Sequence, residues 1–285
     1  MLDLHMHSVH SDGKDDLDAL IDNLKEAGID YFSLTDHDTA EGCRKMLFDE
    51  KLKNKLAENN MTFITGVEFT GIIEDRNVHI LAYDFDIDSP AIKEAEQMEA
   101  AMVNKVNDYR WQCVKEAGFS LTEESVARLK AKKNIRKMDF AELLVENGHY
   151  PDAQTAAREF FTSNYPFADR VDACEIISML SKAGAKMVWA HSIGGVGEKP
   201  LEYDRIRDLA SKMKKLGLVG LECYYSTYTK EQIDVLLKIA DELGLYVSCG
   251  SDYHGKNKPV KLAQFSCDGT PVDLSKITIT KLFKK

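Results

Sequence analysis

The chain lacks the sequence features of a disulfide-rich, zinc-ribbon or membrane protein. Its six cysteines are scattered over 285 residues without a C-x-x-C pair, so neither a disulfide framework nor a zinc ribbon is indicated. The first residues carry no basic segment, and no apolar run is long enough for a signal peptide or a membrane span. We therefore expect reduced, mostly buried thiols, no membrane association and a cytoplasmic location.

The chain also lacks an excess of basic residues. Its 37 lysines and arginines are outnumbered by 47 acidic residues, which gives a formal net charge of -10. Tracking along a long nucleic acid needs a basic face that neutralises phosphates, so this composition argues against that function. Small anionic substrates remain compatible, because a cluster of divalent metals reverses the local charge of an acidic protein at one place. Composition leaves the oligomeric state open.

Internal repeats and low-complexity tracts are absent, and short apolar segments alternate with helical patterns instead. The segments expected to form strands are 2–5, 31–35, 63–67, 78–83, 187–190, 219–223 and 246–249. Helical spacing of apolar residues covers 17–27, 205–216 and 230–243. Alternation of this kind predicts an α/β fold with a largely parallel sheet, either open or closed into a barrel.

The alternation stops between residues 90 and 165, where helical segments follow one another without a convincing strand. We interpret 90–165 as a helical insertion, and 1–89 together with 166–285 as the main domain. The insertion contains a basic run at 128–137 that includes Arg136. The simplest interpretation of that run is a solvated helix end and loop.

Histidines gather at the expected strands. Six of the eight histidines lie in them or just after them, whereas His10 and His149 do not and are interpreted as structural or surface residues. The carboxyl ends of parallel strands converge on one mouth, so side chains distant in sequence can meet there. With three nearby acids, the candidate metal ligands are His5, His7, Asp12, His37, Glu68, His79, His191, Asp252 and His254.

The spacing of these residues suits metal binding. The strand period of two places both imidazoles of His5-Met-His7 on one face, where they can bind one metal. Asp252 and His254 repeat this spacing near the other end of the chain, and closure of a barrel would bring the two pairs together. Glu68 stands in an apolar run where unpaired burial is costly, so bridging two metals is its natural use.

Alternative roles stay open for several of these residues when each is considered alone. Asp12 either binds metal or caps the helix that follows it. His79 and His191 are either ligands or core histidines with satisfied hydrogen bonds. One of the two aspartates that flank His37 could orient this imidazole or cap the next helix.

Nitrogen and oxygen ligands without cysteine favour Mn, Fe or Zn in an open site over a thiolate-bound structural zinc. Nine ligands are too many for one ion but suit two or three neighbouring ions. Such a site activates water near neutral pH and polarises a phosphoryl oxygen, which points to hydrolysis of a phosphate ester.

The order of these motifs resembles the PHP (polymerase and histidinol phosphatase) family from the first residues to about Gly255. The matching motifs are His5-x-His7, Ser11-Asp12-Gly13, Thr35-Asp36-His37-Asp38, Gly66-Val67-Glu68, His79, Ala190-His191 and Gly250-Ser251-Asp252-x-His254-Gly255. The resemblance implies a distorted seven-stranded (β/α) barrel of PHP type, with residues 90–165 as an insertion. It also implies a trinuclear site with a metal-activated hydroxide as nucleophile, and no covalent intermediate on the protein.

Matching the motifs residue by residue implies one ligand set for each metal. The sets are His5, His7, Glu68 and Asp252 for the first, Glu68, His79 and His191 for the second, and Asp12, His37 and His254 for the third. Glu68 would bridge the first two metals. We expect the same nine residues to be the catalytic ones.

Within the family, the chain is most similar to the branch that acts on nucleoside 3′,5′-bisphosphates and on the 5′ ends of short RNAs. This branch usually carries Gly-Arg-Pro-His in the insertion, where Arg136 is retained here but Met138 replaces the histidine. Tyr228 stands where relatives commonly have histidine, and Ser192 replaces the proline that often follows the histidine after the fifth strand. These departures concern the substrate pocket, not the metal ligands.

Arg136 is the preferred candidate for binding a substrate phosphate, followed by Tyr225, Ser226 and Lys256. Three other functions stay open. A phosphatase of another small phosphomonoester, such as histidinol phosphate, would use the same metals. An amidohydrolase would bridge its metals with a modified lysine, for which no suitable lysine stands at a strand end. A non-catalytic PHP structural module would have degenerate ligand positions, whereas every position is filled here.

Overall fold

The computed structural model describes residues 1–132, 135–161, 170–195 and 199–284. These residues form two compact units, one of Met1–Glu96 with Val171–Lys285 and the other of Gln97–Arg170. The division therefore falls within helix α4 (Pro90–Glu116), not at its first residue. Ile92 and Ala95, in the first two turns of α4, are completely buried and belong to the first unit.

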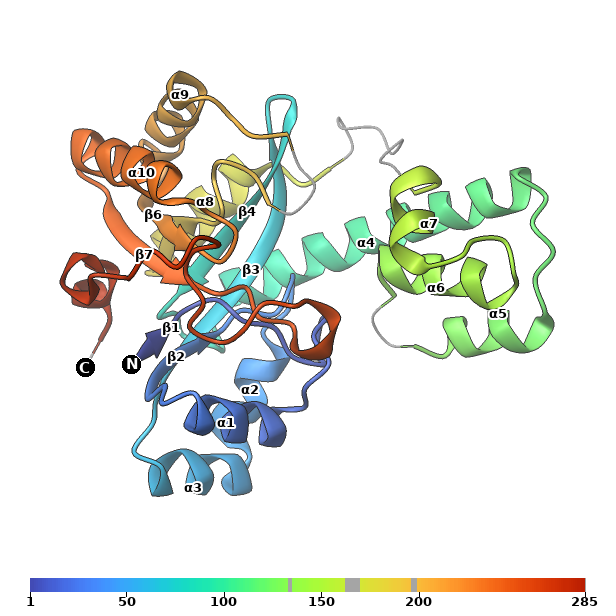
Figure 1. Ribbon diagram of the computed structural model, residues 1–285, viewed down its shortest axis with the longest axis horizontal. Helices are drawn as coiled ribbons and strands as arrows, with labels where there is room; N and C mark the ends of the chain where they lie inside the picture. The colour runs from blue at the N-terminus through green and yellow to red at the C-terminus, as the bar shows by residue number, and fades with distance from the viewer. Residues whose placement is uncertain (133–134, 162–169, 196–198, 285) are drawn as a thin grey trace. The chain divides into compact units, whose positions relative to one another are not determined.

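Seven strands form one sheet in the order in which they occur along the chain (Figure 1). They are β1 (Leu2–Asp3), β2 (Tyr31–Leu34), β3 (Thr62–Ile73), β4 (Arg76–Tyr83), β5 (Lys186–Trp189), β6 (Leu218–Tyr225) and β7 (Tyr246–Gly250). Each strand overlaps one of the segments predicted from the apolar pattern. The α/β class and the seven-stranded barrel are therefore confirmed.

The barrel is distorted because one of its strands runs against the others. β1, β2 and β3 are mutually parallel, as are β5, β6 and β7, but β4 is antiparallel to both of its neighbours. β3 and β4 form a hairpin instead of a strand–helix–strand unit. The ring nearly closes where the chain after β1 meets the chain after β7: Met6 bridges Tyr253, and His7 N–H donates to Tyr253 O at 2.8 Å.

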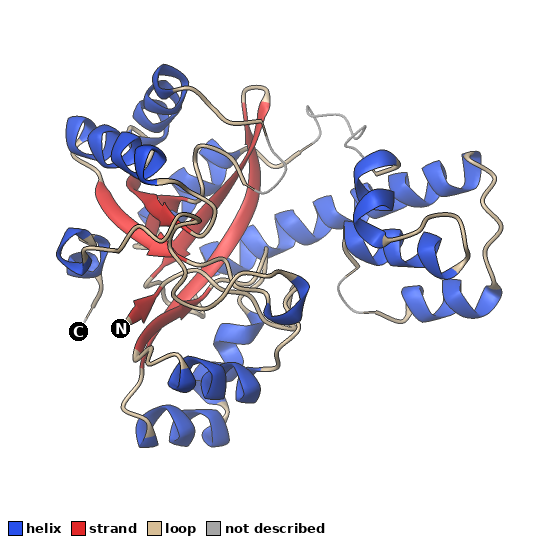
Figure 2. Cartoon of the chain, in the orientation of Figure 1, coloured by secondary structure: helices blue, strands red, loops and turns tan. Residues whose placement is uncertain are grey.

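Helices surround this sheet in the first unit (Figure 2). They are α1 (Leu17–Glu26), α2 (Glu41–Phe48), α3 (Glu50–Glu58), α8 (Ala173–Lys182), α9 (Tyr203–Lys214) and α10 (Lys230–Leu243). α1 shows why they form: Leu17, Leu20, Ile21 and Leu24 recur at helical spacing and are all buried. Short 3-10 turns follow β7 at Gly255–Asn257, Leu274–Lys276 and Ile279–Leu282.

The second unit is helical throughout the part that the structure describes. Besides most of α4, it contains α5 (Glu123–Lys130), α6 (Lys137–Glu146) and α7 (Ala153–Glu159). It has a hydrophobic core of its own, in which Phe140, Leu144 and Ala156 are completely buried. Across both units, no described helix combines the length and the apolar character that a membrane span requires.

Candidate metal centre

The carboxyl ends of the parallel strands and the β3–β4 hairpin bring all nine predicted ligands together. His5, His7 and Asp12 follow β1, His37 follows β2, Glu68 and His79 lie within the hairpin, His191 follows β5, and Asp252 and His254 follow β7. Within the described residues, three groups of side chains have ligand atoms close enough to hold a metal ion. Glu68 belongs to two of these groups.

The first group joins both ends of the sequence. It consists of His5, His7, Glu68 and Asp252, with one ligand atom from each residue, all within 4.8 Å of one another. Oε2 of Glu68 lies 3.1 Å from Nε2 of His5 and 3.1 Å from Nε2 of His7. Nε2 of His7 is also 3.1 Å from Oδ1 of Asp252. These four residues are the ones expected to hold the first metal.

Two further imidazoles, those of His79 and His191, lie at the other oxygen of the same carboxylate. Oε1 of Glu68 lies 3.0 Å from Nδ1 of His79 and 3.1 Å from Nε2 of His191. The second group itself consists of His37, Glu68 and His79, so His37 stands where the predicted ligand set has His191. Nδ1 of His37 lies 3.3 Å from Oε2 of Glu68. The two oxygens of Glu68 thus face different imidazoles, the arrangement of a carboxylate that bridges two ions.

The third group lies on the other side of His7. It contains His7, Asp12, His37 and His254, and Nε2 of His254 is 3.2 Å from Oδ1 of Asp12. The alternative that Asp12 caps the next helix is wrong, because Asp16 is the N-cap of α1 and accepts from Ala19 N–H. His7 and His37 each take part in two groups, so the three groups form one continuous cluster.

The buried atoms of this cluster fit metal ions. Side chains of His5 and His7 are fully buried, and that of Glu68 is 1% exposed. Nε2 of His5, Nε2 of His7, Nε2 of His254 and Oε2 of Glu68 make no hydrogen bond to the described residues. Burying such groups without a partner is costly, and divalent cations among them would satisfy all four. Imidazole and carboxylate donors without thiolate suit Mn, Fe or Zn.

Electrostatics within the cluster favour positive charge at its centre. Burial lowers the pKa of His7, but the neighbouring carboxylates of Asp252 and Glu68 outweigh this effect and raise the pKa to about 9. Burial lowers the pKa of His37 to about 3, because attraction to Glu68 and Asp12 does not compensate for the lost solvation. The carboxylates that attract a proton to His7 would attract a metal cation to the same place.

Asp36 and Asp38 support the loops that carry the ligands. Asp36 accepts hydrogen bonds from Ser8 N–H at 2.8 Å and from Ser11 Oγ at 2.7 Å, which fixes the loop between His7 and Asp12. Asp38 accepts from Thr70 N–H at 2.8 Å. Neither aspartate caps the next helix, because the N-cap of α2 is Ala40.

Glu222 was missed by the sequence analysis. This residue of β6 is completely buried, and its Oε1 lies 2.9 Å from Nδ1 of His5. Its Oε2 accepts the backbone N–H of His191 at 2.8 Å, and His191 has the left-handed φ of 28° that non-glycine residues seldom adopt. A signal was present in the sequence, because Glu222, like Glu68, is an acid inside an apolar strand.

Of the predicted substrate contacts in the barrel, Tyr225 lies beside the metal ligands. Its hydroxyl donates to Oδ2 of Asp252 at 2.9 Å, and its ring centroid lies 5.2 Å from that of His191. Ser226 is buried, and its hydroxyl makes no hydrogen bond to the described residues. Lys256 is exposed, whereas Lys258, which was not predicted, places Nζ 2.8 Å from Oδ2 of Asp252.

Tyr228, one of the departures from the family pattern, is completely integrated into the core. Its hydroxyl oxygen accepts the N–H of Ile193 at 2.9 Å, and its ring lies 5.1 Å from that of Tyr225. It therefore holds the loop that follows His191.

His149, one of the two histidines that the sequence analysis excluded from the metal ligands, lies in the unit of Gln97–Arg170. Its Nε2 is 2.8 Å from Ser120 O.

Arg136 belongs to the unit of Gln97–Arg170, where it precedes α6. The pKa of the nearby Arg110 is lowered to about 10, first by burial and then by repulsion from Arg136 and Arg170. Nη1 of Arg110 donates to Oδ1 of Asn107 at 2.8 Å, which holds it in place. Three guanidinium groups therefore lie near one another in this unit.

A nearly closed α/β barrel with imidazoles and carboxylates clustered at the ends of its strands defines a metal-dependent hydrolase. The model of the PHP domain family matches residues 3–163, which is more than half of the chain. The chain therefore belongs to the PHP family, as its motifs predicted.

Curated relatives act on phosphate esters. A 5′-3′ exoribonuclease from Haemophilus influenzae is 27% identical over 259 residues, covering 88% of this chain and 89% of the relative. A 3′,5′-nucleoside bisphosphate phosphatase from Chromobacterium violaceum is 26% identical, covering 89% and 87%. A phosphoribosyl 1,2-cyclic phosphate 1,2-diphosphodiesterase from Eggerthella lenta is 27% identical, covering 89% and 94%.

Solved structures share the fold. A protein from Bifidobacterium adolescentis, described as a metal-dependent phosphoesterase, has a TM-score of 0.76 at 25% identity and covers 100% of this chain and 96% of its own. A structure from Chromobacterium violaceum has a TM-score of 0.75 at 24% identity. Together with the family and the ligand cluster, these findings identify the chain as a metal-dependent phosphoesterase.

Proposed function

We propose that the protein hydrolyses a phosphate monoester of a small nucleotide, either a nucleoside 3′,5′-bisphosphate or the 5′ end of a short RNA. The observation that carries the proposal is the position of Glu68 between two groups of imidazoles, one around each of its oxygens. This arrangement supports a multinuclear centre, and two of the relatives carry these nucleotide activities in their names.

Three divalent ions of Mn, Fe or Zn would be held by the nine clustered side chains. The first set would be His5, His7, Glu68 and Asp252, the second Glu68, His79 and His191, and the third Asp12, His37 and His254. His37 is close enough to the second set to be shared. Bound ions of this kind activate water and polarise a phosphoryl oxygen.

The residues around the ligands would keep them in position. Tyr225 and Lys258 both contact Oδ2 of Asp252, so Oδ1 is the oxygen turned toward His7. Glu222 hydrogen-bonds to Nδ1 of His5, which leaves Nε2 of that ring for a metal. Through these contacts, Tyr225, Lys258 and Glu222 determine which ligand atoms face the centre.

Arg136 would bind the phosphate that is not hydrolysed. Its proximity to Arg110 and Arg170 supports this role, because guanidinium groups bind phosphate oxygens through paired N–H donors. Tyr225, Ser226 and Lys256 are weaker candidates for contacts with the substrate. Of these, Tyr225 and the buried Ser226 belong to the end of β6 and its loop, in the unit that holds the ligands.

Other substrates remain distinct alternatives. The relative from Eggerthella lenta is named for a cyclic phosphate diester, so the substrates tested should include a cyclic phosphate. Histidinol phosphate would test a phosphomonoester without a nucleotide. A non-catalytic module is disfavoured by the ligand cluster, in which every expected position is filled and no lysine is a member.

The test is phosphate release by the manganese-loaded protein from a panel of esters. The panel contains 3′-phosphoadenosine 5′-phosphate, a short 5′-phosphorylated RNA, AMP, histidinol phosphate and a phosphoribosyl 1,2-cyclic phosphate, with His7→Ala as the inactive control. A higher kcat/KM for the bisphosphate or RNA supports the proposal. Activity confined to one of the other esters would replace the substrate, and inactivity on all five with metal bound would favour the non-catalytic module.

A further inference from the structure

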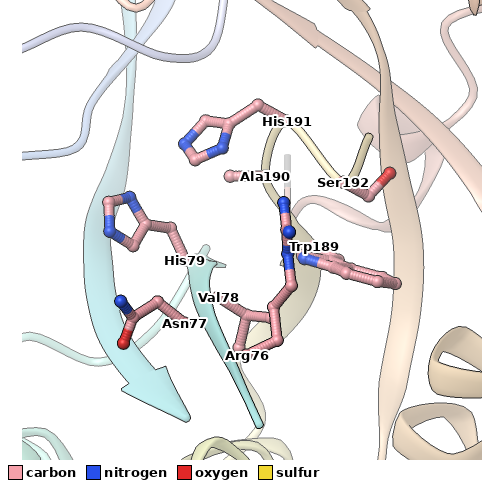
Figure 3. A pocket seen from close by; sticks show the side chains of 8 residues that line it. All are labelled: Arg76, Asn77, Val78, His79, Trp189, Ala190, His191 and Ser192. Carbon is pink, nitrogen blue, oxygen red and sulfur yellow. The ribbon is translucent and has the colours of Figure 1, made fainter. Parts of the chain in front are cut away.

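A small pocket opens beside two of the metal ligands, His79 and His191. It is lined by residues from the start of β4 and the end of β5 with its loop: Arg76, Asn77, Val78, His79, Trp189, Ala190, His191 and Ser192 (Figure 3). Its enclosed space is about that of one water molecule, which suits a single oxygen of a larger group, and its mouth is open to solvent. Every lining residue belongs to the barrel unit.

The pocket lies at an accessible edge of the metal centre. The side chains of His79 and His191 are 26% and 11% exposed, whereas those of His5 and His7 are fully buried. Ala190 N–H donates to His79 O at 2.9 Å, which holds the two ligand-bearing segments side by side. A substrate that enters here would meet the imidazoles around Oε1 of Glu68 first.

The polar side chains of β4 that line the pocket are hydrogen-bond donors. Asn77 lies two residues before His79, so the strand period directs both to the same face. Arg76 extends toward the loop of Ala190 and His191 in Figure 3, and its Nη1 donates to Lys199 O at 2.9 Å. This contact fixes the arginine at the rim of the pocket.

Arg76 is not the cation that holds the β3–β4 turn. Arg205 does so, with its two Nη atoms 2.7 Å from Glu74 and 2.8 Å from Asp75, and Lys212 also pairs with Glu74. A planar guanidinium beside a metal centre is well suited to an oxyanion, because its N–H groups match the geometry of phosphate oxygens. A cationic or neutral substrate group would gain much less from the guanidinium of Arg76.

We propose that Arg76 and Asn77 form an oxyanion pocket that binds the outer oxygens of the phosphoryl group held at the metal centre next to His79 and His191. This inference deepens the proposed function and rests on it for the identity of the ester. It assigns Arg76 to the reacting phosphate and Arg136 to the second one. Arg76 should therefore matter equally for every phosphomonoester, whereas Arg136 matters only for substrates with a second phosphate.

The test measures binding of inorganic phosphate to the manganese-loaded protein by titration calorimetry, with metal content determined for each variant. Arg76→Met should weaken phosphate binding about 10-fold or more, as expected for loss of a charged hydrogen bond. Arg76→Lys should have an intermediate affinity, because it keeps the charge without the paired donors. Asn77→Asp should also weaken binding, since it replaces an amide donor with an anion.

Two arginines provide matched controls. Arg207→Met removes an exposed cation that pairs with Glu242, and Arg205→Met loosens the hairpin turn without touching the pocket lining. Both should bind phosphate like the wild type. Equal weakening by Arg205→Met would assign the effect to the hairpin and overturn the proposal.

Unchanged phosphate affinity in Arg76→Met with a full metal complement would also overturn it, even if nucleotides are hydrolysed. Conversely, an Arg76-dependent phosphate site in a protein that cleaves no nucleotide would support the pocket and reject the proposed substrate. The two proposals therefore fail in different measurements.

Discussion

Nδ1 of His5 lies 2.9 Å from Oε1 of Glu222, although the two residues are 217 positions apart in the sequence. The other oxygen of Glu222 accepts the backbone N–H of His191 at 2.8 Å. One buried carboxylate thus contacts two ligand-bearing segments, after β1 and after β5. It orients the ring of His5 so that Nε2 faces Glu68, 3.1 Å from Oε2. Such a contact selects the tautomer that a metal requires.

Glu222→Gln is expected to lower the affinity for Mn²⁺ by about 10- to 100-fold, the usual effect of losing a carboxylate behind a histidine ligand. Glutamine retains the shape but can accept only through its single amide oxygen, so one of the two contacts is lost. Metal titration by calorimetry and the circular dichroism spectrum of the metal-free protein are the measurements. Glu242→Gln, an exposed glutamate, is the control. An unchanged affinity would show that Glu222 does not position His5.

Gly250→Ala is expected to damage the same contact by steric overlap. A Cβ at this position would lie 2.1 Å from Cβ of His5 and 2.8 Å from Oε1 of Glu222. Because both neighbours are buried, we expect a loss of about 1–3 kcal/mol in unfolding free energy, together with weaker metal binding. Denaturant unfolding of the metal-free protein measures the first effect.

Gly269→Ala is the control for that substitution. Gly269 has a positive φ of 78° and open space around it, so alanine there reports only the backbone cost. If Gly250→Ala were no more destabilising than Gly269→Ala, and bound Mn²⁺ equally well, the close approach of His5 and Glu222 would not be a constraint.

The sequence predicted the parts of this site that depend on local patterns. His5 and His7 share a strand face by the period of two, and Glu68 stands out because an acid in an apolar strand needs a partner. The antiparallel hairpin was not predicted, because an apolar segment such as 78–83 has the same composition in either direction. Contacts between distant residues were also missed, since nothing near Lys258 in the sequence indicates its ion pair with Asp252.

Asp252→Asn is expected to abolish turnover while the protein remains folded. Oδ1 of Asp252 is 3.1 Å from Nε2 of His7, and Oδ2 contacts Tyr225 and Lys258. The amide keeps the shape but removes the negative charge on which a cation would depend. Phosphate release, with Asp234→Asn as an exposed control, measures the effect. Wild-type turnover in a variant with its full metal complement would remove Asp252 from the ligand set.

Removal of metal is expected to lower the stability of the wild type more than that of Asp252→Asn, because the substitution weakens the first of the three ion sites. A ligand present at 100 times its dissociation constant adds about 2.7 kcal/mol to the unfolding free energy. Denaturant unfolding with Mn²⁺ and with a chelator should show a stabilisation by metal that is smaller in the variant than in the wild type by an amount of this order. A similar stabilisation of the variant would place the bound metal elsewhere.

Arg136→Ala is expected to raise KM more for 3′-phosphoadenosine 5′-phosphate than for AMP. The bisphosphate has a second phosphate that could contact the group of Arg110, Arg136 and Arg170, whereas AMP has only the phosphate that is hydrolysed. Arg158→Ala is the matched control, because Arg158 is 71% exposed in the same unit and pairs only with its neighbour Glu159 among the described residues. Steady-state kinetics on both substrates decide the question. Equal increases in KM would mean that Arg136 does not discriminate between them, and the preference for nucleotides would then need another residue.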